Sequence, residues 1–286
     1  MSTFGARLGA AMDAHGPLCV GIDPHASLLA DWDLTDDVAG LRAFALTVME
    51  AVAGRVAAVK PQSAFFERHG SAGLAVLEEV IAAGRETGTL VIVDAKRGDI
   101  GSTMGAYADA FLRDGSPLAG DALTVSPYLG FGSLEPAVQA AAASGRGLFV
   151  LALTSNPEGA TVQHARDGDG VAVADRIARS AAALNAAETA RSGAPLGSVG
   201  LVVGATIGDA ATRLGVDLAA VRGPLLAPGV GAQGAGPAEL AAVFGSARNA
   251  VLASSSRGVL SAGPGVPELR RAAELASADA ARALRD

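Results

Sequence analysis

Eight short, almost wholly apolar runs recur along the 286 residues, and longer stretches of helix-forming composition separate them. The runs lack the alternation of apolar and polar residues that a half-exposed strand shows. They are therefore typical of parallel strands that are buried on both faces. The runs cover residues 18–23, 56–60, 89–96, 121–126, 147–154, 199–204, 224–229 and 249–256.

The stretches between the runs are rich in alanine, which favours helix, as in residues 36–53, 70–87, 133–144 and 170–190. Eight strands alternating with helices predict an α/β fold, a (β/α)8 TIM barrel that forms a single catalytic domain over residues 1–286. A doubly wound sheet of six or seven strands is the alternative architecture. Segment 156–198 is longer than one crossover needs, and we interpret it as a loop and long helix inserted into the barrel.

Composition excludes several classes of protein. The net charge is −7 and there is no basic block, which disfavours nucleic-acid binding. The single cysteine, Cys19, excludes a disulfide framework, and the four histidines show no metal-ligand spacing. No apolar run reaches the ~18 residues of a membrane span, and the first residues do not resemble a secretory signal. We therefore expect a cytoplasmic protein that binds neither membrane nor metal.

Lysine is rare in this chain, and its placement is informative. Only two of the 22 basic residues are lysines, Lys60 and Lys96, and both end predicted strands. In barrel enzymes the chemistry lies at the carboxyl ends of the strands. Polar residues also occur at strand ends simply because the chain reaches solvent there. That explanation does not account for the placement of both lysines at such ends.

The densest polar segment is VDAKRGDI, residues 93–100. Asp94 and Lys96 are two apart on a strand, so their side chains project to the same face, and Asp99 follows just past the strand end. Two carboxylates around one ammonium would keep that lysine protonated. Such a lysine suits proton donation to a carbanion better than Schiff-base formation. A purely structural ion-pair triad is the alternative.

A glycine-rich segment, PGVGAQGAG at 228–236, follows the seventh run. It formally matches a dinucleotide fingerprint, but the acidic residue expected about 20 positions later is missing. Loops after the seventh and eighth strands of a barrel often bind phosphate. Glycine amides, Gln233 and the guanidinium of Arg257 could form such a site. An ordinary flexible loop beside a solvated arginine is the alternative.

With these residues in place, the chain resembles the orotidine 5′-phosphate decarboxylase family, in its longer bacterial type 2 branch. The resemblance runs from GIDP at 21–24 to SSSRG at 254–258 and is most specific at DAKRGDI, which matches the family's D-x-K-x-x-D motif. It implies decarboxylation of orotidine 5′-phosphate to uridine 5′-phosphate and CO2 without a cofactor, the last step of de novo pyrimidine biosynthesis.

The resemblance also implies a role for each matching residue. Lys60, Asp94, Lys96 and Asp99 match an alternating charge array, in which Lys96 protonates C6 of the pyrimidine and Asp94 lies beside the substrate carboxylate. Five further residues match substrate contacts, to ribose, pyrimidine, phosphate or the neighbouring site: Asp23, Thr103, Ser155, Gln233 and Arg257.

A homodimer is implied as well, because Asp99 and Thr103 match residues that reach the active site of the other subunit. Three other classes stay open. They are a magnesium-dependent sugar-phosphate synthase with a similar motif, a Schiff-base aldolase, and a phosphate-binding barrel without catalytic activity.

Overall fold

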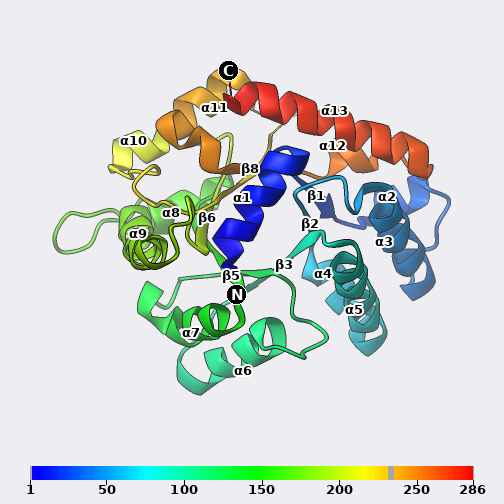
Figure 1. Ribbon diagram of the computed structural model, residues 1–286, viewed down its shortest axis with the longest axis horizontal. Coiled ribbons are helices and arrows are strands. Elements are labelled where there is room, and N and C mark those ends of the chain that lie inside the picture. The colour runs from blue at the N-terminus through cyan, green and yellow to red at the C-terminus, as the bar shows by residue number, and fades with distance from the viewer. Residues whose placement is uncertain (1, 231–234, 286) are drawn as a thin grey trace.

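The eight apolar runs pair in chain order into one closed barrel of parallel strands, with β8 returning to β1. This computed structural model describes residues 2–230 and 235–285 (Figure 1). The predicted (β/α)8 barrel is confirmed, and the doubly wound alternative is wrong. The strands are β1 Leu18–Ile22, β2 Ala58–Pro61, β3 Leu90–Arg97, β4 Ala122–Val125, β5 Gly147–Leu153, β6 Val199–Val203, β7 Leu225–Pro228 and β8 Val251–Ser255.

Helices surround the barrel, and most connect one strand to the next (Figure 1). The helices that follow Thr3 and Asp37 begin at a side-chain cap, and the Asp37 carboxylate accepts a hydrogen bond from the Gly40 amide at 2.8 Å. None of the helices in the described part of the chain has the length and hydropathy of a membrane span. They are α1 Phe4–His15, α2 Ala26–Asp31, α3 Val38–Val52, α4 Ser63–Glu67, α5 Gly70–Thr87, α6 Gly101–Leu112, α7 Glu135–Ser144, α8 Ala160–Gln163, α9 Val173–Ser192, α10 Ala210–Leu214, α11 Pro237–Phe244, α12 Arg257–Leu260 and α13 Val266–Arg285.

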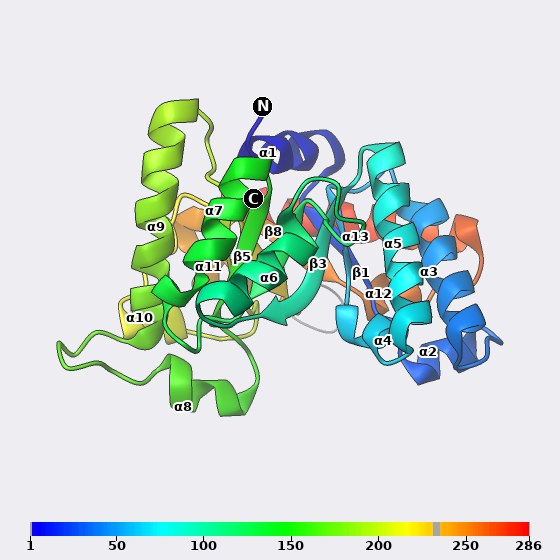
Figure 2. The same ribbon diagram turned by 90° about the horizontal axis from the view of Figure 1, so that it is seen from below.

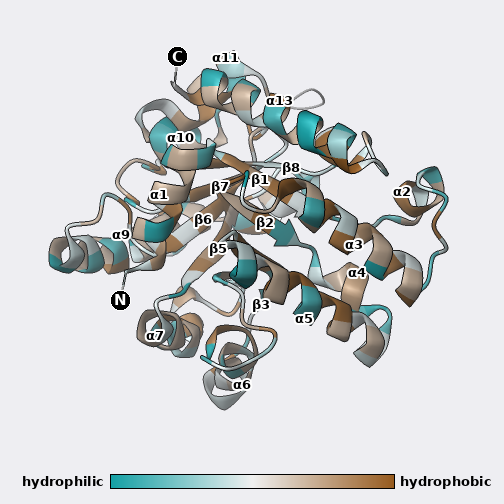
Figure 3. Ribbon diagram, turned by 45° about the vertical axis from the view of Figure 1, so that its right-hand side comes forward, coloured by the Kyte–Doolittle hydropathy of each residue, from teal (hydrophilic) through white to brown (hydrophobic). Residues whose placement is uncertain are grey.

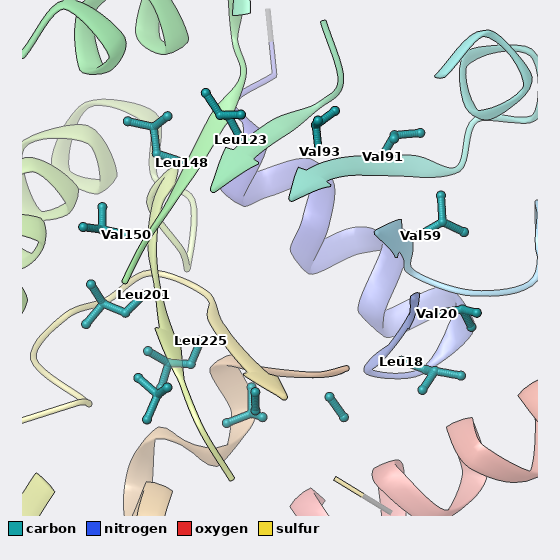
Figure 4. Packing of buried hydrophobic residues seen from close by; sticks show 14 of the residues in the cluster. Leu18, Val20, Val59, Val91, Val93, Leu123, Leu148, Val150, Leu201 and Leu225 are labelled. Atoms are coloured by element: carbon teal, nitrogen blue, oxygen red, sulfur yellow. The ribbon is translucent and has the colours of Figure 1, made fainter. Parts of the chain in front are cut away.

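The strand side chains build two separate cores. Alternate residues such as Leu18, Val20 and Val91 point outward into the layer between strands and helices, as Figure 4 shows. The residues between them, including Cys19 and Ile92, fill the barrel interior. Both faces of each strand are therefore buried, which explains why the runs are apolar throughout. Figure 3 shows the hydrophobic strands at the centre and hydrophilic residues along outer helices such as α13.

Helix α1 closes the amino-terminal end of the barrel, a role that the sequence did not reveal. Phe4, Leu8 and Met12 are buried against the interior residues. The Phe4 ring meets the Phe149 ring edge to face, with 6.0 Å between centroids. Figure 2 places α1 at one end of the barrel and α8 at the other. The carboxyl end of the barrel, toward which the strands run, is thus the end left for a site.

Segment 156–198 contains the short helix α8 and the long helix α9. Between them the chain makes an excursion in which Arg166 and Ala172 form an antiparallel bridge. Arg176 of α9 stabilises this excursion through ion pairs with Asp167 and Asp169, each at 2.5 Å. Figure 2 shows the excursion projecting beyond α9.

We predict that Phe4→Ala lowers the free energy of unfolding by about 3–5 kcal/mol, because it removes a buried ring and leaves a cavity in the barrel interior. Chemical denaturation measures this change. Leu275→Ala on α13, where the leucine is 58% exposed, is the matched control and should change stability by less than about 0.5 kcal/mol. A loss below about 1 kcal/mol for Phe4→Ala would mean that α1 is not part of the core.

Candidate active site

A cavity of about 600 Å³ opens at the carboxyl ends of the strands. Its walls combine a largely apolar surface with several charged and hydroxyl groups, which is typical of a small-molecule site. Six of the residues predicted from the sequence line it. They are Asp23, Lys60, Asp94, Lys96, Ser155 and Arg257.

The centre of the cavity floor is the carboxylate of Asp94, which lies between two ammonium groups. Its Oδ2 is 2.8 Å from Nζ of Lys60, and its Oδ1 is 2.6 Å from Nζ of Lys96. Strand pairing explains this placement, because β2 and β3 are parallel neighbours whose carboxyl ends meet at the same edge. The Lys60 side chain is 7% exposed, whereas that of Lys96 is 44% exposed and reaches into the cavity.

These contacts determine the protonation states of Asp94 and Lys60. Burial by itself would raise the pKa of Asp94, but the positive charges of Lys60 and Lys96 and their hydrogen bonds outweigh burial and lower that pKa to about 2. Burial likewise opposes the charge on Lys60, and the nearby carboxylates of Asp94 and Asp23 overcome it, so that the pKa of Lys60 is raised. At neutral pH the cavity floor therefore holds a carboxylate and a buried ammonium.

The predicted flanking of Lys96 by two carboxylates does not form within one chain. Asp99 does not line the cavity, and its Oδ1 accepts a hydrogen bond from the Ile100 amide at 2.8 Å. The reason is that β3 ends at Arg97 and the chain then turns away into α6. Thr103, in the first turn of α6, is exposed and also outside this cavity. Instead of two carboxylates around Lys96, the chain places the single carboxylate of Asp94 between the ammonium groups of Lys60 and Lys96.

Asp23 lines the cavity beside Lys60. Its Oδ1 lies 4.0 Å from Nζ of Lys60, too far for a hydrogen bond. The same oxygen is buried, and within residues 2–230 and 235–285 it has no hydrogen-bond partner. A buried acceptor without a donor is costly, and the nearby positive charge of Lys60 offsets part of that cost.

One wall of the cavity is the turn after β5. Gln163 of α8 donates to Oγ1 of Thr154 at 2.7 Å and accepts from the Thr154 amide at 2.9 Å. The Thr154 hydroxyl in turn donates to Oδ1 of Asn156 at 2.7 Å. Ser155 lies between these two fixed residues, exposed and lining the cavity. The Ser155 hydroxyl makes no hydrogen bond to any described residue, so it is available to a ligand.

The opposite wall comes from the ends of β7 and β8. Gly229, with φ of +89°, and Arg257, at the start of α12, both line it. The Arg257 side chain is exposed and makes no ion pair with any residue that the structure describes. Its guanidinium is therefore available to an anionic ligand. Gln233, the other residue predicted here, lies outside the described residues.

Thr124 on β4 is a cavity residue that the sequence analysis missed. Its side chain is almost wholly buried, and its hydroxyl lies 2.8 Å from Oδ1 of Asp94 and 2.9 Å from the Lys96 amide. The signal for it in the sequence was one threonine inside the apolar run 121–126. That signal is weak, because the burial of the side chain depends on strand register.

Comparison with known proteins places this barrel in a family. The model of the family described as "Orotidine 5'-phosphate decarboxylase / HUMPS family" matches residues 16–272. Orotidine 5′-phosphate decarboxylase of Streptomyces coelicolor is 62% identical over 274 residues, covering 96% of this chain and 95% of that protein. The enzyme of the same name from Salinispora arenicola is 61% identical over 284 residues, covering 99% of each.

Solved structures agree with the sequence comparisons. A crystal structure from Streptomyces avermitilis, assigned to the same enzyme, superimposes with a TM-score of 0.94 at 60% identity, covering 100% of this chain and 97% of the other. The OMP decarboxylase of Leishmania donovani gives 0.73 at 30% identity, covering 99% of each. The chain is thus a member of the orotidine 5′-phosphate decarboxylase / HUMPS family and an enzyme of the carboxy-lyase class.

Proposed function

We propose that this chain converts orotidine 5′-phosphate to uridine 5′-phosphate and CO2 without a cofactor, and that Lys96 protonates the C6 carbanion. The observation that carries the proposal is the ionised Asp94 between Lys60 and Lys96 at the floor of the cavity. Loss of CO2 leaves an electron pair on a ring carbon, and no electron sink is available in the pyrimidine at that position. A fixed ammonium beside that carbon stabilises the developing charge electrostatically.

Lys96 is the better proton donor of the two lysines because of where it lies. Its ammonium is held at 2.6 Å by Asp94 on one side and is open to the cavity on the other. Lys60 is enclosed, and its raised pKa makes it a fixed positive charge. In the proposed step the C6–CO2 bond breaks, the electron pair stays on C6, and an Nζ proton of Lys96 moves to C6.

The rest of the cavity fits the rest of the substrate. Asp23 and Lys60 would contact the ribose hydroxyls, and Ser155 would bind the pyrimidine edge. Arg257, with Gln233, would bind the phosphate. The phosphate is remote from C6, so its binding energy can hold the substrate carboxylate against Asp94. These assignments are supported by the positions of Asp23, Ser155 and Arg257 in the cavity lining and by the exposure of the Ser155 and Arg257 side chains.

We further propose that the whole chain is one catalytic domain, with 156–198 as an insertion, that works as a cytoplasmic homodimer. Asp99 and Thr103 would complete the neighbouring site. Support comes from the surface around them. Ile100, Tyr128 and Leu129 are exposed by 61%, 76% and 55%, and they follow the ends of the neighbouring strands β3 and β4. Exposed large apolar side chains of this kind are common in subunit interfaces.

The alternative chemistries fit the charge array less well. Both oxygens of Asp94 are already engaged by ammonium groups, and two positive charges beside it would repel a magnesium ion. A Schiff base needs a neutral amine, and the carboxylates around Lys60 favour its protonated form. A non-catalytic phosphate-binding barrel would have no use for a buried, alternating array of charges.

The direct test is to incubate the purified chain with orotidine 5′-phosphate in the presence of EDTA. The loss of ultraviolet absorbance and the release of CO2 then measure turnover. We expect turnover that added magnesium does not increase. Failure to turn over with or without magnesium would rule out the decarboxylase proposal. Turnover only with magnesium would favour the synthase chemistry, and a borohydride-trapped adduct on either lysine would favour the aldolase.

We predict that Lys96→Ala lowers kcat at least about 10³-fold, because it removes both the proton and the positive charge beside C6. Unfolding by denaturant should show a stability change below about 1 kcal/mol, because the Lys96 side chain is nearly half exposed and Asp94 keeps Lys60 and Thr124 as partners. Lys96→Arg is the matched variant. It keeps the ion pair but holds its proton too firmly to give it up, so it should also be inactive. An active Lys96→Arg variant would contradict proton donation by Lys96.

The dimer proposal predicts complementation between two inactive variants. In a hybrid of Lys96→Ala and Asp99→Ala subunits, one site loses both residues and the other keeps both. Random exchange of equal amounts should therefore restore about one quarter of wild-type activity, as expected for a two-fold dimer. Native mass spectrometry verifies that hybrids form. Hybrids without activity would show that Asp99 does not serve the partner's site.

A further inference from the structure

Strand β3 is irregular at the point where it carries the charged residues. Val93 pairs with Leu123 and Arg97 pairs with Val125. Strand β3 therefore advances by four residues over a stretch in which β4 advances by two. Lys96 lies inside this bulge with φ of +48°, in the left-handed region that non-glycine residues rarely adopt. Bulges of this kind re-aim side chains and interrupt the regular strand hydrogen bonds. The Lys96 amide therefore needs an acceptor other than the neighbouring strand backbone.

Thr124 supplies that acceptor from the residue of β4 that faces the bulge. Its Oγ1 lies 2.9 Å from the Lys96 amide and 2.8 Å from Oδ1 of Asp94. The chemistry of the groups determines which one donates in each of the two hydrogen bonds. An ionised carboxylate only accepts, so the single hydroxyl proton of Thr124 goes to Asp94. The lone pairs of the hydroxyl then accept from the Lys96 amide.

One buried hydroxyl thus holds two members of the charge array at once. It restrains the backbone of Lys96 in its uncommon conformation, and it orients the carboxylate that Lys96 and Lys60 share. Thr124 is 1% exposed, so water does not readily replace these hydrogen bonds. Valine in its place would have the same shape, but it would leave the Lys96 amide without an acceptor and Asp94 with one donor fewer.

We propose that Thr124 is a positioning residue, whose hydroxyl fixes the Lys96 backbone and the Asp94 carboxylate in the geometry that the reaction needs. Its effect on catalysis rests on the proposed decarboxylation. Thr124 lines the cavity but acts through its two neighbours. It should therefore affect the chemical step more than substrate binding.

The test compares Thr124→Val with Thr124→Ser, which keeps the hydroxyl. Thr189→Val is the matched control, because Thr189 is also buried and its hydroxyl donates to the Asn185 carbonyl at 2.8 Å in α9, away from the cavity. We expect Thr124→Val to lower kcat by about 10- to 100-fold with KM within about threefold, as for loss of one hydrogen bond to a charged group. Thr124→Ser and Thr189→Val should stay within about threefold of wild type.

A second measurement, amide hydrogen exchange at Lys96 by NMR, does not depend on activity. The amide should be protected in wild type and in Thr124→Ser, and should exchange at least about tenfold faster in Thr124→Val. A kcat of Thr124→Val within about twofold of wild type, or an unprotected Lys96 amide in wild type, would overturn the role of Thr124. A wild-type protein without turnover would instead refute the proposed function, and the exchange comparison would still decide whether Thr124 holds Lys96.

Discussion

Burying the Asp94 carboxylate costs free energy that only well-placed partners can offset. Among the described residues three donors surround it, two of them ammonium groups, and they come from three neighbouring strands, β2, β3 and β4. Such a cluster needs parallel strands whose carboxyl ends meet at one edge, which the closed barrel provides. The barrel in turn keeps the Asp94 and Lys60 side chains largely buried, where their charges act more strongly on a bound molecule than they would in water.

Stability and chemistry are divided between the two ends of the barrel. At the amino-terminal end, Phe4 of α1 packs into the interior, and Arg7 pairs with Asp121 and donates to the Gly145 carbonyl at 3.1 Å. At the carboxyl end, charged and hydroxyl groups line the cavity, and one oxygen of Asp23 is unpaired among the residues that the structure describes. The apolar interior between the two ends separates them, so the site can hold costly, unpaired groups while the core supplies the stability.

Much of this architecture could be predicted from the sequence because buried parallel strands leave an unmistakable apolar pattern. Lys60, Asp94 and Lys96 could be found because they end such strands. The pairing of Lys60 with Asp94 and the role of Thr124 depend on the register between strands, which no local pattern encodes. The expected approach of Asp99 to Lys96 does not occur within one chain, because β3 ends at Arg97, the chain then turns into α6, and Asp99 accepts from the Ile100 amide instead.

The protonation state of Asp94 tests the central claim, that two ammonium groups hold this buried carboxylate ionised. Carbon-13 NMR of labelled aspartate, with the Asp94 resonance assigned through Asp94→Asn, follows that state directly. Because the pKa is lowered to about 2, the chemical shift should stay constant from pH 7 down to about pH 4. A midpoint at or above about 4, the ordinary value for aspartate, would contradict the account.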